Sequence, residues 1–362
     1  MGTLEYVFHP NNPLMTTRRD FLKSASMAVV GSMLVQPGLS HSASSARVAF
    51  DLHCHPAMFF AQGTTLYKGD ERFAETIQSM NDANLSGAFF SLVGDAPLIE
   101  TTPTGIKPKG QYQKGQGAKE YERQITIIKQ LLAKNNLNIA KQGNDTSKND
   151  LAVFLSIEGG DLLEGDLQLL DQMQEDGVRS IQIVHYVPNV LGDLQTENAQ
   201  HRGLSSIGKQ LVKRMNRLKM VIDVAHASHD TVKDVVAITD SPIILSHSIL
   251  KMEADRPIGK RAISAEHARA VASVGGVIGA WPSGFNKSFD EYVDNVKRLV
   301  DVVGIDHVGL GTDMDANFRP VIDTYKQLPT LQSQLIVKGF SQADAEKIMG
   351  LNAQRVIRQV LG

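Results

Sequence analysis

The feature that most constrains this chain is an alternation of short apolar segments with longer amphipathic ones, which begins at Arg47. Eight of the apolar segments have the length and composition of β-strands. They run from Val48 to His55, Ser86 to Val93, Leu151 to Glu158, Arg179 to Tyr186, Val221 to Ser228, Pro242 to Ser248, Gly275 to Trp281 and His307 to Asp313. Helical patterns lie between them. Eight strand and helix pairs in roughly 315 residues predict an α/β fold, a (β/α)8 TIM-type barrel forming one catalytic domain.

An open doubly wound sheet is the alternative fold for such an alternation. A Gly-x-Gly-x-x-Gly turn after the first strand would favour it, and the sequence has none there. The net charge of −2 gives no reason to expect nucleic acid as a partner. The single cysteine, Cys54, excludes a disulfide within the chain. We therefore expect a barrel over residues 47–362 that depends on packing alone.

The first 46 residues have the pattern of an export signal. The segment Thr17-Arg18-Arg19-Asp20-Phe21-Leu22-Lys23 resembles a twin-arginine motif, and a short apolar core from Ala25 to Val35 follows it. A helix that spans a bilayer needs roughly 20 apolar residues, so this core is too short to serve as one. Small residues from Ala43 to Ala46 offer cleavage points. We expect a twin-arginine-type signal over residues 1–46, recognition by the twin-arginine export machinery, and a periplasmic location.

The motif Asp51-Leu52-His53-Cys54-His55 ends the first predicted strand. Side chains alternate between the two faces of a strand, so His53 and His55 are expected on one side, with Asp51 one step further back on that side. Two imidazoles placed in this way can bind one metal ion. Cys54 is expected on the opposite face, as a buried apolar thiol.

Histidine and carboxylate residues stand at the ends of six of the eight predicted strands. They are His53, His55, Glu158, His185, His226, His247 and Asp313. The C-terminal ends of barrel strands meet at one rim, where reactive groups gather. Burying an ionisable group after an apolar run costs several kcal/mol unless the group is paired or ligated. A single one of these residues would be interpreted as structural, whereas the whole set indicates a metal site.

The composition of this set also indicates the metal. Imidazole and carboxylate together suit zinc or a similar first-row ion, and a carboxylate can bridge two ions. The residues are too many for one tetrahedral centre that keeps a position open. We therefore expect two Zn²⁺ ions, or another divalent first-row pair. Water between two such ions is acidified to hydroxide while the ions polarise a carbonyl, which predicts hydrolysis of an amide or ester.

The order and spacing of these motifs resemble the membrane dipeptidase (renal dipeptidase) family of zinc peptidases. Gly177-Val178-Arg179 before the fourth strand and Gly304-Ile305-Asp306-His307 before the eighth strengthen the resemblance. It implies hydrolysis of dipeptides, with a first metal at the Asp51-x-His53-x-His55 motif. It also implies that Glu158 bridges the metals and that His226 and His247 bind the second one.

The same resemblance assigns roles in substrate binding and proton transfer. His185 matches the histidine that stabilises the tetrahedral intermediate, and Asp313 matches the acid/base residue. The arginine that binds the substrate's terminal carboxylate in this family best matches Arg261, with Arg256 as a rival.

His55 is a departure from the family, which usually has an aspartate at this position. A neutral ligand then replaces an anionic one, and the motif becomes similar to the His-x-His of the wider amidohydrolase superfamily. Dipeptide specificity is therefore less firmly implied than metal-dependent hydrolysis. Two alternatives stay open: an amidohydrolase that acts on N-acyl-amino acids or lactones, and a non-catalytic exported protein that uses a metal to anchor its ligand.

Outside these motifs the sequence says less. Residues Asp95 to Ala118 are rich in Pro, Gly, Lys and Gln, which predicts a long loop on the active-site face, either a lid or a segment without a catalytic part. Trp281 ends the seventh strand, where it would line the substrate pocket or pack in the core. Four other histidines of the predicted barrel are expected to be solvated or structural: His201, His229, His267 and His307. The oligomeric state, a homodimer included, stays open.

Overall fold

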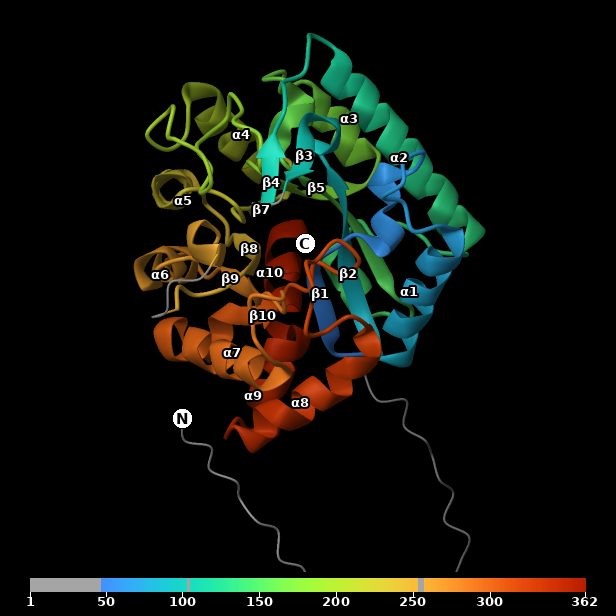
Figure 1. Ribbon diagram of the computed structural model, residues 1–362, viewed down its shortest axis with the longest axis vertical. Helices are drawn as coiled ribbons and strands as arrows, with labels where there is room; N and C mark the ends of the chain where they lie inside the picture. Colours follow the sequence, from blue (N-terminus) through green and yellow to red (C-terminus); the bar gives the residue numbers. More distant parts are fainter. Residues whose placement is uncertain (1–46, 103–104, 253–256) are drawn as a thin grey trace, which may run out of the picture. The chain divides into compact units, whose positions relative to one another are not determined.

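The computed structural model describes residues 47–102, 105–252 and 257–362 of the chain. Within these residues, eight parallel strands close into a barrel, and their order around it is the order of the chain (Figure 1). They are β1 (Ala49–Cys54), β2 (Leu85–Val93), β5 (Ala152–Glu158), β6 (Val178–Gln182), β7 (Val221–Asp223), β8 (Ile244–Ser248), β9 (Val277–Ala280) and β10 (Val308–Leu310). Each overlaps one of the eight predicted strands, so the predicted (β/α)8 barrel is confirmed. The predicted signal over residues 1–46 and Arg256 lie outside the described residues.

Helices lie around the barrel, and one, α10 (Asn352–Leu361), lies at its end (Figure 1). They are α1 (Asp70–Asp82), α2 (Gln116–Lys134), α3 (Leu169–Glu175), α4 (Ser206–Arg217), α5 (His229–Ile238), α6 (Ala265–Ser273), α7 (Phe289–Val303), α8 (Leu328–Val337), α9 (Gln342–Glu346) and α10 (Asn352–Leu361). Serine side chains cap the N-termini of α4, α5, α6, α7 and α9 by accepting a hydrogen bond from a backbone N–H of the first turn. Among the described residues, no helix is both long and apolar enough to cross a bilayer.

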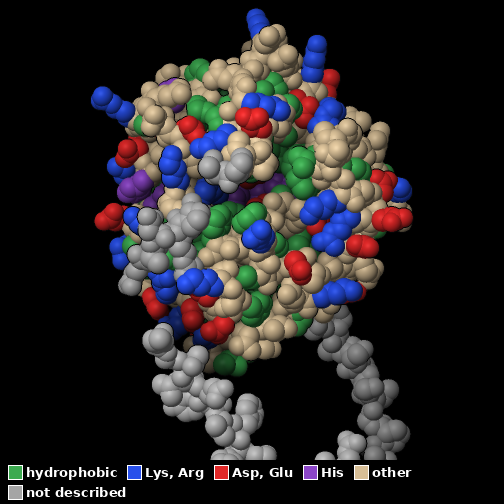
Figure 2. Space-filling model, viewed as in Figure 1, with side chains coloured by type: hydrophobic (Ala, Val, Ile, Leu, Met, Phe, Trp, Pro, Cys, Tyr) green, Lys and Arg blue, Asp and Glu red, His purple; other side chains and the backbone are tan. Residues whose placement is uncertain are grey.

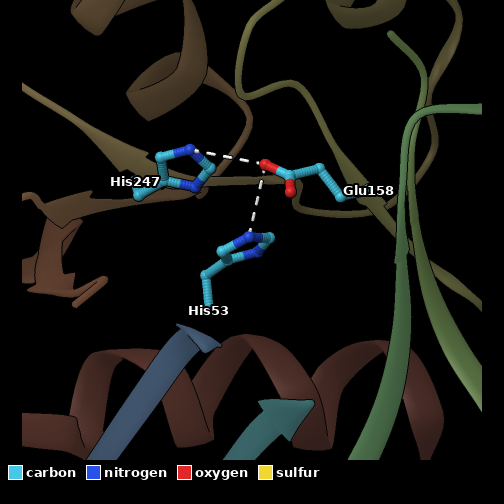
Figure 3. Close-up of side chains that lie close together, drawn as sticks. All are labelled: His53, Glu158 and His247. Atoms are coloured by element: carbon cyan, nitrogen blue, oxygen red, sulfur yellow. Dashed lines mark ion pairs between the residues drawn. The ribbon is translucent and has the colours of Figure 1, made fainter. Parts of the chain in front are cut away.

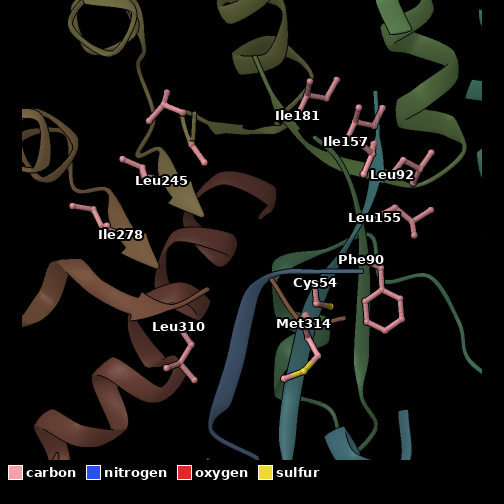
Figure 4. Packing of buried hydrophobic residues seen from close by; sticks show 14 of the residues in the cluster. Cys54, Phe90, Leu92, Leu155, Ile157, Ile181, Leu245, Ile278, Leu310 and Met314 are labelled. Carbon is pink, nitrogen blue, oxygen red and sulfur yellow. The ribbon is translucent and has the colours of Figure 1, made fainter. Parts of the chain in front are cut away.

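Apolar side chains of the strands pack in two separate layers. One layer, which includes Phe90, Leu155 and Ile181, packs together with apolar residues of the surrounding helices (Figure 4). The other contains Phe50, Phe89 and Phe154, whose rings lie 5.6–6.0 Å apart between centroids, and it packs against the apolar face of α10. Figure 1 shows α10, in red, inside the ring of strands. This helix therefore closes the N-terminal end of the barrel.

The predicted loop from Asp95 to Ala118 contains regular structure. An antiparallel hairpin of β3 (Ile99–Thr102) and β4 (Gly105–Pro108) occupies its centre, and α2 begins before its end. The segment after the hairpin contacts the connections that follow β5 and β6, because Gly115 N–H donates to Glu164 and the Gln111 amide donates to the Pro188 carbonyl. The loop therefore lies at the C-terminal side of the barrel, as predicted, but the hairpin was missed.

Candidate metal centre

Glu158 lies at the centre of a group of histidines at the C-terminal mouth of the barrel. Its Oε1 lies 3.3 Å from His53 Nε2, 3.4 Å from His226 Nε2 and 3.7 Å from His247 Nε2 (Figure 3). Its Oε2 lies 3.2 Å from His55 Nε2. These five side chains come from the C-terminal ends of four strands, β1, β5, β7 and β8, or from the residues shortly after them, and all are buried. The structure thus brings the predicted ligands together.

The histidines around Glu158 form two pairs. The Nε2 atoms of His53 and His55 lie 3.0 Å apart, and so do the Nε2 atoms of His226 and His247. Three sets of residues have one ligand atom each within 4.8 Å of one another: His53, Glu158 and His247; His53, His55 and Asp313; Glu158, His185 and His226. Because the sets share residues, they form one cage around the Glu158 carboxylate.

Hydrogen bonds outside the cage fix two of the imidazoles. His55 Nδ1 lies 2.9 Å from the Ser91 carbonyl oxygen, which only accepts, so Nδ1 donates to it and Nε2 faces the cage. His185 Nδ1 lies 2.6 Å from Asp95 Oδ1, and the other oxygen of Asp95 accepts from the backbone N–H groups of Tyr186 and Val187. Partners of this kind orient histidines at metal and catalytic sites.

Burial and charge divide the histidines into two kinds. Burial lowers the pKa of His226 and of His247 well below the usual value, so both are neutral and offer a lone pair. Burial acts on His53 in the same direction, but the Glu158 carboxylate outweighs it and raises the pKa of His53 to about 9. Burial alone would raise the pKa of Glu158, yet His185 and His53 hold it well below its usual range. The donor set fits divalent first-row cations, since a cation can replace the proton on His53 and pair with the carboxylate.

The sequence model of the membrane dipeptidase family, peptidase family M19, matches residues 41–361, which is most of the chain. The chain belongs to the membrane dipeptidase family. It is 26% identical over 301 residues to dipeptidase verJ of Clonostachys rogersoniana, covering 80% of this chain and 76% of that one. It is also 26% identical over 230 residues to dipeptidase 3 of Mus musculus, covering 60% of this chain but only 46% of the mouse protein.

Solved structures of metallopeptidases share the fold. Dipeptidase AC, a family M19 metallopeptidase, has a TM-score of 0.72 at 20% identity, covering 87% of this chain and 98% of that one. A metallopeptidase from Rhodobacter sphaeroides, liganded with a phosphinate mimic of the dipeptide L-Ala-D-Ala, has a TM-score of 0.72 at 18% identity, covering 87% of this chain and 99% of that one. The family membership supports a metal-dependent peptide hydrolase.

A β-bulge in β1 decides which side chains of this family member reach the cage. Asp51 pairs with Ala88 but Cys54 pairs with Phe90, so β1 has one residue more than β2 between these pairs. Such an extra residue moves the following side chains to the other face of the strand. The prediction that Asp51 lies on the same side as His53 and His55 is therefore wrong. Its carboxylate accepts hydrogen bonds from Thr312 and Tyr325, at 2.5 and 2.6 Å. Cys54 is buried in the layer that packs against the surrounding helices, on the face away from the cage, as expected.

A second irregularity places His247. The pairing of β8 with β9 shifts between Leu245 and Ser248. At this point the Ser246 carbonyl comes so close to Gly279 and Gly311 that a Cβ on either would lie 1.8 Å from it. Only glycine allows this approach. Asp223 fixes the same segment by accepting from Ser246 N–H at 3.0 Å. Sequence reasoning missed Asp223, although it lies on a predicted strand three residues before His226.

Arg261 lies at the rim of the cage with unused donors. The side chain is 7% exposed, and its Nη1 donates to Gln195 Oε1 at 2.7 Å. Within the described part of the chain, Arg261 Nε, Arg261 Nη2 and Trp281 Nε1 are buried without a hydrogen-bond partner. The Arg261 Cζ lies 5.5 Å from the centroid of the Trp281 ring. Buried donors without a partner are costly, and these three donors are open to an acceptor group.

Several further residues complete the picture of the site. Asp313 Oδ1 lies 3.5 Å from His55 Nε2, and Asp313 and His226 both have left-handed backbone angles, with φ of 53° and 62°. Such conformations cost about 1–3 kcal/mol each and gather at functional sites. Four histidines take no part in the three ligand sets found among the described residues: His201, His229, His267 and His307. Asp95 and Gln195 were missed as site residues, although Asp95 directly follows the Val93-Gly94 strand end, where a carboxylate is a useful signal.

Proposed function

We propose that this chain is a dipeptidase that depends on two zinc ions. His53, His55 and Glu158 would hold the first ion, and Glu158, His226 and His247 would hold the second. The observation that carries this proposal is the position of the Glu158 carboxylate between two histidine pairs. Oε1 lies 3.3–3.7 Å from His53, His226 and His247, and Oε2 lies 3.2 Å from His55, so this one carboxylate reaches members of both pairs. The similarity to dipeptidases, and the dipeptide mimic bound by the Rhodobacter sphaeroides enzyme, support the substrate class.

Two such cations would supply an acidified water as nucleophile and would polarise the scissile carbonyl. The protein would do the rest with its own side chains. Arg261 would bind the terminal carboxylate of the dipeptide through Nε and Nη2, which have no partner among the described residues. His185, with its Nδ1 hydrogen-bonded to Asp95, would donate from Nε2 to the oxyanion that develops on the carbonyl oxygen.

Asp313 would take the proton of the attacking water and pass it to the leaving amine. Burial raises the pKa of Asp313 to about 6, against the opposing effect of His55 and His53. A carboxyl with a pKa near neutrality can both accept and release a proton during turnover. Its position beside His55 places it at the edge of the cage, where this transfer would take place.

Export is a separate part of the proposal. Residues 1–46 would be a twin-arginine signal removed in the periplasm, which would leave residues 47–362 as the working enzyme. The described barrel begins directly after this segment. N-terminal sequencing of the exported protein tests this proposal. A start between Ala43 and Arg47 agrees with it, and retention of the arginine pair contradicts it.

The activity is tested with a substrate panel. Dipeptides of L- and D-residues, N-acyl-amino acids and lactones are offered to the zinc-loaded protein, with the Glu158→Gln variant as a blank. Dipeptide cleavage that is absent from the blank is the expected result. Turnover confined to acyl-amino acids or lactones would replace the proposal by the amidohydrolase alternative. A zinc-loaded protein with no turnover at all would favour a binding protein.

A further inference from the structure

A small apolar cluster lies beside Arg261, separate from the main core. Its buried members are Ile249, Met252 and Trp281, and Ala262 and Phe285 pack against them half-buried. The cluster stands at the ends of β8 and β9, on the same rim as the cage. Figure 2 shows histidine side chains recessed near the centre of this face, with hydrophobic side chains beside them. An apolar surface therefore adjoins the carboxylate-binding position.

The aromatic members of this cluster continue as a row from the cage to the surface. The His247 and Trp281 rings lie 5.7 Å apart between centroids, Trp281 and Phe285 5.9 Å, and Phe285 and Phe318 6.1 Å. Phe318, at the outer end, is 57% exposed. A large exposed apolar side chain that continues a buried row toward a site indicates a surface for a ligand. We call Trp281, Phe285 and Phe318 the aromatic row.

Hydrogen bonds from the Gly284 backbone and the Asn286 side chain hold the aromatic row in place. Gly284 N–H donates to the Phe318 carbonyl at 2.7 Å, so the loops that carry Phe285 and Phe318 are joined. A Cβ on Gly284 would lie 2.5 Å from the Arg319 carbonyl oxygen, so the two loops approach as closely as glycine allows. The Asn286 amide donates to the Trp281 carbonyl at 3.2 Å. The row is thus formed before a ligand arrives, which lowers the entropy cost of binding.

The position of Arg261 determines which residue of a bound dipeptide lies next to the aromatic row. Its guanidinium lies over the Trp281 ring, the inner end of the row. A dipeptide with its carboxylate on Arg261 has its C-terminal residue next to Trp281. We propose, on the basis of the proposed dipeptidase function, that the preferred substrates carry an aromatic or large apolar side chain on this C-terminal residue, and that the side chain lies along the aromatic row.

Matched dipeptides test the preference. Ala-Phe and Ala-Leu are compared with Ala-Ala, and Phe-Ala serves as the control with the same composition as Ala-Phe. We expect kcat/KM for Ala-Phe to exceed that for Ala-Ala and Phe-Ala by about tenfold or more, as apolar pockets discriminate side chains by 10–200-fold. Equal values for Ala-Phe and Ala-Ala would overturn the inference.

Substitutions at the exposed end of the row locate the effect. Phe318→Ser should raise KM for Ala-Phe about fivefold to tenfold and change KM for Ala-Ala by less, and Phe318→Leu should retain most of the wild-type KM for Ala-Phe. The matched control is Val337→Ser on α8, a site 73% exposed and outside the row, which should change neither substrate. Phe318→Ser acting equally on both substrates would contradict a role in specificity.

The only tryptophan of the chain, Trp281, reports binding without turnover. Fluorescence is titrated with free L-phenylalanine and free L-alanine, which carry the same carboxylate. We expect L-phenylalanine to change the emission at a concentration at least about fivefold lower than L-alanine does. A protein that prefers phenylalanine but cleaves no dipeptide would contradict the proposed function and leave the row as a binding surface. A dipeptidase without preference in either assay would contradict the inference alone.

Discussion

The two ends of the barrel use the same eight strands for opposite purposes. At the N-terminal end, Phe50, Phe89 and Phe154 pack against α10 in a layer of apolar side chains. At the C-terminal end, Glu158 and four histidines are just as buried but are polar and partly charged. On β5 the two ends are only four residues apart, at Phe154 and Glu158. The N-terminal end therefore stabilises the barrel through apolar packing. The C-terminal end buries polar and charged side chains, which is unfavourable for stability but places reactive groups together.

Glu158→Gln should have the largest effect, because it removes the one carboxylate that faces both histidine pairs. We expect turnover to be abolished and metal content to fall, while circular dichroism and the thermal midpoint stay close to wild type. The matched control is Glu175→Gln on the exposed surface of α3, which should behave as wild type. Near-normal turnover by Glu158→Gln would show that the C-terminal end of the barrel does not depend on this carboxylate for chemistry.

Asp313→Asn tests proton transfer apart from the histidine cage. The amide keeps the shape of the carboxyl but cannot accept the proton, so we expect turnover to be abolished in a folded and metal-loaded protein. Metal content and kcat are measured on the same sample. A metal-loaded Asp313→Asn protein with near-normal kcat would refute the acid/base role.

Phe154→Ala tests the opposite end of the barrel. Loss of this buried ring should lower the free energy of unfolding by about 3–5 kcal/mol, because the cavity is enclosed by neighbouring rings and α10. Denaturant titration measures this loss, and kcat on a dipeptide should stay within about twofold of wild type. A variant as stable as wild type, or one with a large loss of kcat at full folding, would show that the two ends are not separate in function.

Asp95→Asn should have a moderate effect, since Asp95 acts through His185. Partners of catalytic and metal-binding histidines contribute about 10–100-fold, and we expect a loss of that size in kcat. Burial lowers the pKa of His185, whereas Asp95 and Glu158 together raise it above the usual value. The variant should therefore also shift the basic limb of the pH profile for kcat to lower pH. A loss of kcat with an unchanged pH profile would indicate a purely structural role.

Metal affinity should depend on pH through His53. In the metal-free protein His53 holds its proton up to a pKa of about 9, and a metal must displace this proton to bind. Affinity should thus rise about tenfold per pH unit from pH 7 toward pH 9. Titration calorimetry in buffers of different ionisation enthalpy measures the released proton. Affinity that is flat over this range would mean that His53 is already neutral.

The barrel could be predicted from the sequence because its strands are continuous apolar runs, such as Ala152 to Ile157, that end in polar residues. The same endings predicted the convergence of the cage, since parallel strands in a barrel place their C-termini at one rim. The bulge in β1 could not be predicted, because it depends on the register between β1 and β2 and not on the local sequence. For this reason the prediction that Asp51 lies on the same face of the strand as His53 and His55 was wrong.

The loop residues that hydrogen-bond to the site residues could not be predicted from the sequence either. Gln195 reaches Arg261 and Asp95 reaches His185 across 66 and 90 residues of sequence. Such contacts depend on how the long connections fold over the mouth, and their polar composition predicts only that they are loops. The hairpin of β3 and β4 was missed for the same reason, as Pro, Gly and Lys dominate its surroundings.

The central claim is that His53, Glu158, His226 and His247 hold a pair of cations. Anomalous diffraction at the zinc edge, on crystals of the zinc-loaded protein, tests it most directly. We expect two peaks a few Å apart, one beside His53 and His55 and one beside His226 and His247, with the Glu158 carboxylate between them. Loaded crystals without a peak at these residues, or with peaks only elsewhere on the chain, would contradict it.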